Sequence, residues 1–141
     1  MHENLKRIMY ISRARHRMTK GERVDLLAGA RIRNEKSGIT GLLVYDAGYF
    51  AQVLEGPESS IESLLANIAK DPRHDEYSLV SEGLVDERYF EGWSMDWANL
   101  KFMDDSRHKG LRGKLSSTGI TDRSIVYSAL MAFVEEHRKS R

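Results

Sequence analysis

The sequence contains no cysteine among its 141 residues. The chain therefore forms no disulfide bond, binds no metal through thiolates and uses no cysteine nucleophile. Long apolar segments are also missing, since no run approaches the roughly 18 residues that a membrane span requires. The first residues lack the apolar core of a signal peptide. We therefore expect a cytoplasmic protein that makes no contact with a membrane.

An excess of charge of one sign is absent as well. Lysine and arginine number 22, aspartate and glutamate number 21, and the formal net charge is +1. No strong field attracts nucleic acid, so we expect no nucleic-acid partner. At 40% hydrophobic and 30% charged residues the composition is that of an ordinary globular protein. The length suits one domain with a small accessory segment and leaves no room for a separate catalytic domain.

Motifs of common catalytic and metal sites are also missing. The sequence has no glycine-rich dinucleotide fingerprint, no phosphate-binding loop and no serine in a nucleophile elbow. The five histidines are scattered, with no pair at the i, i+4 spacing of a helical metal site. We therefore expect no metal ion and no catalytic residue.

The N-terminal part of the chain predicts one strand followed by one helix. A strand is expected over residues 5–12, and Thr19 with Glu22 forms a capping box for a helix that starts near residue 20 and ends near Asn34. The expected apolar face of this helix consists of Val24, Leu27, Ala28 and Ile32.

A hairpin and a second helix are expected next. The strands are residues 39–45 and 49–55, joined by a turn at 46–48 that contains a glycine. Pro57 suits the first turn of the helix, for which Ser59 and Glu62 offer a second capping box. The Asp71-Pro72 pair ends it. Its apolar stripe is Ile61, Leu64, Leu65, Ile68 and Ala69.

Two more strands are expected, at about 77–85 and 88–96. The resulting β-α-β-β-α-β-β order predicts an α+β fold, a ferredoxin-like sheet with both helices on one face. Beyond it we expect a short helix over 104–116 and a longer one capped by Thr121. The apolar stripe of the longer helix is Val126, Leu130, Phe133 and Val134, widened by Tyr127 and Met131.

A few polar residues occupy positions where apolar ones are expected. Gln52 lies two residues from both Phe50 and Leu54, so the three side chains share one face of their strand. If that face is the core, the amide must find hydrogen-bond partners. Tyr10 shares a face with Ile8 and poses the same question. Each has an ordinary structural interpretation, as an edge-strand glutamine and as a core tyrosine bonded to the backbone.

Two further features also have ordinary interpretations. Asn34 suits the end of a helix, because asparagine tolerates the left-handed conformation found there. Trp93 and Met95 alternate along the last expected strand, where large apolar residues belong to a core or an interface by default.

Six segments that contain these residues resemble the BLUF family, sensors of blue light that use flavin. They are residues 10–12, 33–34, 38–43, 50–56, 71–74 and 90–95, and the likeness in order and spacing extends over about residues 5–97. The resemblance implies a flavin-binding domain at residues 1–97 and a helical extension at 98–141. It also implies FAD as the cofactor, with FMN as the alternative, and self-association of the chain.

The resemblance implies roles by position, with the flavin between the two helices over one face of the sheet. Tyr10 would donate an electron and a proton, Gln52 would bond both Tyr10 and the N5/O4 edge of the ring, and Asn34 would hold the O4/N3 edge. Met95 and Trp93 would pass the change to the last strand. The remaining residues that would bind the cofactor are Phe50, Arg33, Asp71, Arg73 and His74.

Two positions depart from the family pattern. Arg33 stands where many relatives have asparagine or histidine, and it could reach the flavin phosphates or point to solvent. Asn67 stands where some relatives carry an arginine near the ring, so ring contacts on that side differ. The absence of cysteine excludes thiol–flavin adduct chemistry, the other common route of flavin sensors.

The sequence is therefore compatible with three functions. The first is a photosensory switch without turnover, which signals to a separate partner protein in trans. The second is a flavin-dependent oxidoreductase, and the third is a flavin-free ferredoxin-like interaction domain. For the first, the C-terminal helices either transmit the signal or only cover the far face of the sheet.

Overall fold

The computed structural model describes residues 4–14, 19–46, 48–72, 74–92, 94–99 and 123–140. Several predictions lie outside these ranges: the helix over 104–116, the cap at Thr121, and the site residues Arg73 and Trp93. Within the described part of the chain, no helix combines the length and apolar character needed to cross a bilayer.

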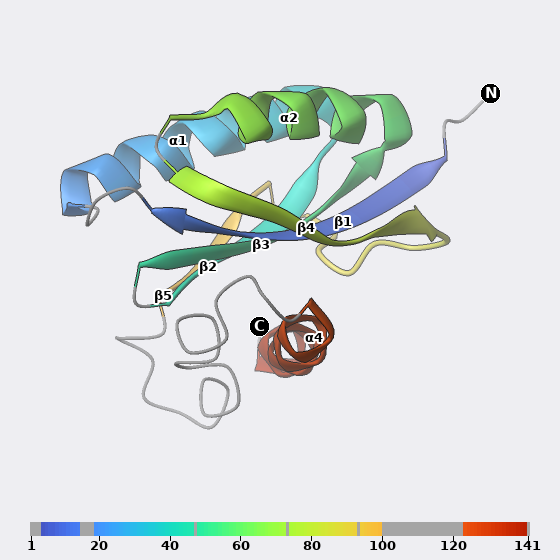
Figure 1. Cartoon of the computed structure of the whole chain (residues 1–141). Coiled ribbons are helices and arrows are strands. Elements are labelled where there is room, and N and C mark those ends of the chain that lie inside the picture. Colours follow the sequence, from blue (N-terminus) through green and yellow to red (C-terminus); the bar gives the residue numbers. More distant parts are fainter. Residues whose placement is uncertain are drawn as a thin grey trace.

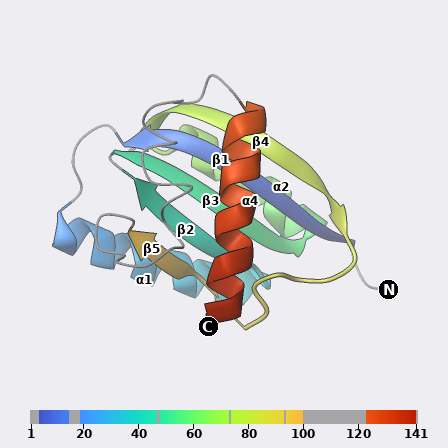
Figure 2. The same cartoon turned by 90° about the horizontal axis from the view of Figure 1, so that it is seen from below.

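The core of the fold is a five-stranded sheet in the order β4-β1-β3-β2-β5 (Figure 1). Strands β1 (Leu5–Ala14), β3 (Tyr49–Pro57), β2 (Thr40–Asp46) and β4 (His74–Val85) pair antiparallel, and the short β5 (Asp96–Asn99) pairs parallel with β2. Helices α1 (Lys20–Ser37) and α2 (Glu58–Lys70) cover one face, and α4 (Arg123–Ser140) crosses the other (Figures 1 and 2). The expected ferredoxin-like arrangement is confirmed.

Helix α1 begins as predicted and ends later. The Thr19 hydroxyl accepts a hydrogen bond from the Glu22 N–H at 3.1 Å, and the Glu22 carboxylate accepts from the Thr19 N–H at 3.2 Å, which confirms the capping box. The predicted end near Asn34 is wrong, because the helix continues to Ser37. Gly38, with φ of 69°, supplies the left-handed C-cap.

The apolar face predicted for α1 is largely wrong. Val24 and Ile32 are 53% and 57% exposed, and Ala28 is exposed as well. The buried residues are Leu27, Ala30 and Asn34. A polar residue therefore lies on the inner face of the helix, and an apolar-only pattern assigns the wrong side to the sheet.

Helix α2 follows β3 directly. The capping box expected from Ser59 and Glu62 is wrong, because the helix already begins at Glu58, and Pro57 as N-cap forms no side-chain bond. Of the predicted stripe, Ile61 is buried, the two leucines and Ile68 are half-buried, and Ala69 is exposed. The Asp71-Pro72 stop is confirmed, since the helix ends at Lys70.

The strand predicted over 88–96 is wrong. Strand β4 is longer than expected, residues 86–92 form bends and turns, and β5 begins only at Asp96. The fully buried Glu55 explains the difference, because its carboxylate accepts hydrogen bonds from the backbone N–H groups of Tyr89 at 3.0 Å and Phe90 at 2.6 Å. These amides therefore bond to a side chain and not to a neighbouring strand.

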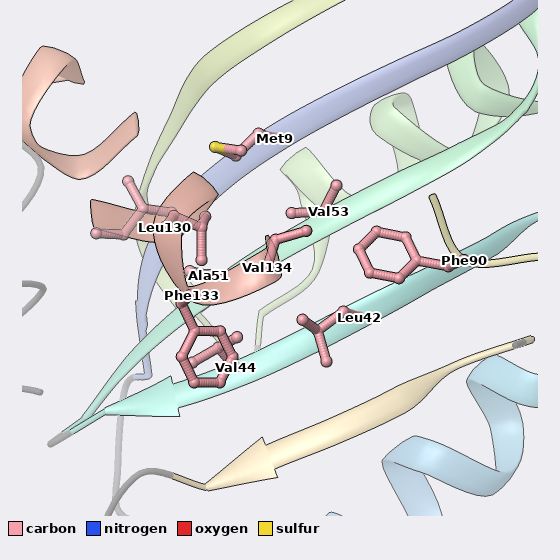
Figure 3. Packing of buried hydrophobic residues seen from close by; sticks show 10 residues of the cluster. Met9, Leu42, Val44, Ala51, Val53, Phe90, Leu130, Phe133 and Val134 are labelled. Atoms are coloured by element: carbon pink, nitrogen blue, oxygen red, sulfur yellow. The ribbon is translucent and has the colours of Figure 1, made fainter. Parts of the chain in front are cut away.

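Two apolar cores lie on opposite faces of the sheet. The first lies under α1 and α2 and contains Ile8, Leu54 and Ile61. The second lies under α4, where Leu130, Phe133 and Val134 point into the sheet and are at most 2% exposed (Figure 3). The predicted α4 stripe is confirmed for these three residues, while Tyr127 is 43% exposed and Met131 half-buried. The side chain of Val126 lies outside the described residues.

Candidate functional site

A pocket opens to solvent between α1, α2 and the face of the sheet that they cover. Its empty volume is about 610 Å³, including the solvent-open part. The walls are mostly apolar and carry a few polar groups. The lining residues are Tyr10, Leu26, Ala30, Arg33, Asn34, Leu43, Phe50, Gln52, Leu64, Ile68, Asp71 and Met95.

A chain of buried polar contacts crosses the floor of this pocket. Gln52 on β3 pairs in register with Tyr10 on β1, so both side chains point to the same face. The Tyr10 hydroxyl donates to Gln52 Oε1, and Gln52 Nε2 donates to Met95 Sδ at 3.4 Å. All three residues are at most 7% exposed. The site thus brings together three of the four residues predicted for the network.

The side-chain amide of Gln52 has hydrogen-bonding capacity that the described residues do not use. It carries two N–H donors and an acceptor oxygen, but its contacts with the described residues are only the phenol and the sulfur. Sulfur is a weak acceptor, and a buried amide with an unused N–H costs free energy. A polar ligand in the pocket would remove that cost.

Asn34 shows the same incomplete bonding. Its side chain is 2% exposed and lines the pocket, and Nδ2 donates to the Ser94 carbonyl at 2.6 Å. Its Oδ1 has no hydrogen-bond donor within the described part of the chain. A ligand N–H group would supply the donor that this oxygen lacks. These two amides, between apolar walls, fit the polar edge of a flat ring such as a flavin.

The other predicted site residues lie around the pocket. Phe50 is buried in the wall, Arg33 is exposed at the lining, and Asp71 is half-buried at the end of α2. His74 begins β4, but its side chain lies outside the described residues. Asn67 is exposed and does not line the pocket.

Some lining residues were not predicted as site residues from the sequence. Leu64 and Ile68 were predicted only as an apolar stripe, and Leu43 only as part of a strand, although Leu43 pairs directly with Gln52. Arg31 was not predicted at all. It donates from Nε to the Met95 carbonyl at 3.0 Å, and only its position three residues before Asn34 could have indicated this.

A second phenol lies beside Tyr10. The ring of Tyr77 on β4 is 5.2 Å from the Tyr10 ring, tilted by 42°. Burial, and to a smaller extent the charge of Glu82, raises the pKa of Tyr77 above its usual value of 10.0. Tyr77 therefore stays neutral at physiological pH.

The sequence profile of one protein family, described as "BLUF: Sensors of blue-light using FAD", matches residues 5–96. The chain belongs to the BLUF family. It is 40% identical over 83 residues to photoactivated adenylate cyclase subunit alpha of Euglena gracilis, a match that covers 59% of this chain but 8% of that protein. The chain thus spans only a small part of that relative.

Solved structures show the same fold over nearly the whole chain. The dark-state structure of BlrB, a BLUF protein, has a TM-score of 0.77 at 27% identity and covers 96% of this chain and 99% of its own. BlrP1 of Klebsiella pneumoniae, with FMN and cyclic diGMP, has a TM-score of 0.70 at 28% identity, covering 94% of this chain and 35% of its own.

This BLUF domain is therefore a blue-light sensor domain that binds flavin, with FAD or FMN as the cofactor. The pocket between α1, α2 and the sheet has apolar walls and polar groups that suit that cofactor. Within the described residues, no group of three or more histidine, aspartate or glutamate side chains could hold a metal ion.

Proposed function

We propose that blue light rearranges a hydrogen-bond network of Tyr10, Gln52 and the flavin, and that the change is signalled to a separate partner protein. The observation that carries this proposal is the contiguous chain from the Tyr10 hydroxyl through Gln52 to Met95 Sδ, buried on the floor of one pocket. A signal generated there has a defined path out of the pocket.

The residues that would hold the flavin follow from the pocket. Gln52 and Asn34 have the unused donor and acceptor for the polar edge of the ring, and Phe50 supplies an apolar wall. Arg33 and Asp71 line the pocket from the ends of α1 and α2, where the rest of the cofactor would lie. Arg73 and His74 remain proposed on the resemblance alone. When bound, the flavin supplies the absorption of blue light and an electron-accepting ring.

The protein supplies a switch that has two alternative arrangements. A phenol can release an electron and a proton together, and the Tyr10 hydroxyl already points at Gln52 Oε1. If the amide of Gln52 reverses, its NH₂ group faces the phenol oxygen, which can accept, and its oxygen faces Met95 Sδ. Neither oxygen nor thioether sulfur donates a hydrogen, so the contact to Met95 is lost. Reversal of the amide therefore releases the side chain of Met95 from Gln52.

The residue after Met95 contacts α4. The Asp96 carboxylate contacts His137 Nε2 at 2.7 Å, and Arg138 lies over the ring of Tyr89 at 4.5 Å. The last turn of α4 is thus attached to both ends of the segment that carries Met95. We propose that α4 transmits the signal from a sensor domain at 1–97 through the extension at 98–141. The buried α4 stripe supports a covering role as well.

We propose a cytoplasmic sensor without catalytic turnover that acts on another chain, including a second copy of itself. Family membership removes the flavin-free interaction domain from the alternatives. No observation favours the oxidoreductase, for which steady oxidation of an added electron donor would be the sign.

The test is an absorption spectrum of the flavin-loaded protein before and after blue light. The wild type is expected to shift to longer wavelength and to recover in the dark, and Tyr10→Phe is expected to lose the shift. Tyr77→Phe is the matched control, because it removes the hydroxyl of the neighbouring ring, whose centroid lies 5.2 Å from that of Tyr10, and should keep the shift. Retention of the full shift in Tyr10→Phe would contradict the proposed network.

A further inference from the structure

Residues 94–96 are held from three elements at once. Helix α1 holds the backbone, through Asn34 on the Ser94 carbonyl at 2.6 Å and Arg31 on the Met95 carbonyl at 3.0 Å. Strand β3 holds the Met95 side chain through Gln52, and α4 holds Asp96 through His137. The segment is therefore a junction between the pocket and α4.

These contacts differ in strength. The Gln52 amide meets a thioether sulfur, which is among the weakest acceptors in proteins. Arg31 brings a guanidinium to a carbonyl in a partly buried contact, and a charge-assisted hydrogen bond of this kind is roughly twice as strong as a neutral one. The backbone of residue 95 is thus held more firmly by α1 than its side chain is held by β3.

The two α1 contacts act as one unit. Arg31 and Asn34 are three residues apart, so they lie on neighbouring turns of the same helix face. The helix that carries them is fixed at both ends, by the Thr19–Glu22 capping box and by the left-handed Gly38. Two successive carbonyls are therefore attached to one rigid element.

We propose that Arg31 is a positioning residue that keeps the Met95 backbone in its dark position after the amide of Gln52 reverses. The inference rests on the proposed network. Once the contact from Gln52 to the sulfur is lost, the α1 contacts are what keep Met95 facing the pocket. A backbone that stays in place lets the side chain re-engage Gln52 quickly, so Arg31 sets the lifetime of the lit state.

Loss of Arg31 should therefore slow dark recovery without changing the light reaction itself. For Arg31→Ala we expect a red shift of normal size and a recovery about tenfold slower, the factor expected when one hydrogen bond to a charged group is removed. Arg31→Lys should restore part of the rate, since an ammonium group can donate to the same carbonyl. Lys36→Ala is the control, because it removes an exposed positive charge from the same helix.

A second measurement reads the dark state directly. With ¹³C-methyl-labelled methionine, the Met95 signal of Arg31→Ala should shift or broaden in the dark, because the residue samples a second position. The signal of Met9, on the opposite face of the sheet under α4, should not change. A variant with only a structural defect would lower the melting temperature but leave both the recovery rate and the Met95 signal unaltered.

The outcomes separate this inference from the proposed function. A recovery rate within twofold of wild type, a faster one, or an unchanged Met95 signal overturns the role of Arg31. If Arg31→Ala fails to retain flavin, Arg31→Leu decides, because it keeps an apolar side chain there without a donor, and a Met95 signal identical to wild type in that variant overturns the proposal. If Tyr10→Phe keeps its red shift the network fails instead, and the dark Met95 signal still tests Arg31.

Discussion

The two faces of the same sheet differ in how completely their buried polar groups are hydrogen-bonded. On the α4 face, the fully buried Glu55 carboxylate has a complete set of partners: Arg7 Nε at 3.0 Å, the N–H groups of Tyr89 and Phe90, and the Thr40 hydroxyl at 3.3 Å. On the helix face, the amides of Gln52 and Asn34 are equally buried and incompletely bonded. These residues differ in the partners that the protein provides, not in burial.

This difference identifies which face holds the ligand. A buried polar group that the protein satisfies stabilises the fold, whereas the two amides that it leaves partly unsatisfied line the pocket and are placed to bond a ligand there. Glu55 and Gln52 are three residues apart on β3 and therefore point to opposite faces. One strand thus carries a structural polar residue and a functional one.

The largest expected effect on stability comes from the α4 face. Phe133→Ala should lower the free energy of unfolding by about 3–5 kcal/mol, because it opens a cavity in the core under α4. Chemical denaturation measures the loss. Tyr127→Ala, on an exposed position of the same helix, should cost far less. A small loss for Phe133→Ala would mean that α4 does not cover this face in solution.

The next effect concerns Glu55. Glu55→Ala should cost about 3 kcal/mol, since it leaves Arg7 and two backbone amides without their acceptor. Denaturant midpoints of this variant and of Glu87→Ala, an exposed glutamate in the following bend, give the comparison. Equal midpoints for the two variants would remove the distinction between the faces.

A smaller effect is expected where the two regions meet. His137→Ala removes the contact to Asp96, which is partly exposed and should contribute about 1 kcal/mol. Hydrogen exchange of the backbone amides in the last turn of α4 should become faster, while the dark flavin spectrum stays the same. Unchanged exchange there would show that Asp96 does not hold α4.

Much of the fold could be predicted because it depends on local chemistry. The Thr19–Glu22 capping box, the glycine-containing hairpin and the alternation around Gln52 each follow from a few neighbouring residues. The inner face of α1 could not be predicted in the same way. Asn34 is buried there and Ile32 is exposed, because Asn34 lines a pocket that forms only when the helix packs on the sheet.

The strand expected over 88–96 failed for a related reason. Its residues suit a strand, but the amides at 89 and 90 bond to Glu55, which lies more than thirty residues earlier in the chain. The contact of Arg31 with the Met95 carbonyl spans 64 residues and was equally hidden. The resemblance located Tyr10, Asn34, Gln52 and Met95, whereas the residues that hold them in place required the tertiary structure.

The most direct test of the central claim uses Gln52→Leu, which fills the same space without an amide. The measurement is the light-minus-dark absorption difference of the flavin-loaded variant. Our account predicts a folded protein that is less stable by about 1–3 kcal/mol, because the buried Tyr10 hydroxyl loses an acceptor, and no red shift, because no amide remains to reverse. A full red shift in Gln52→Leu would contradict the account.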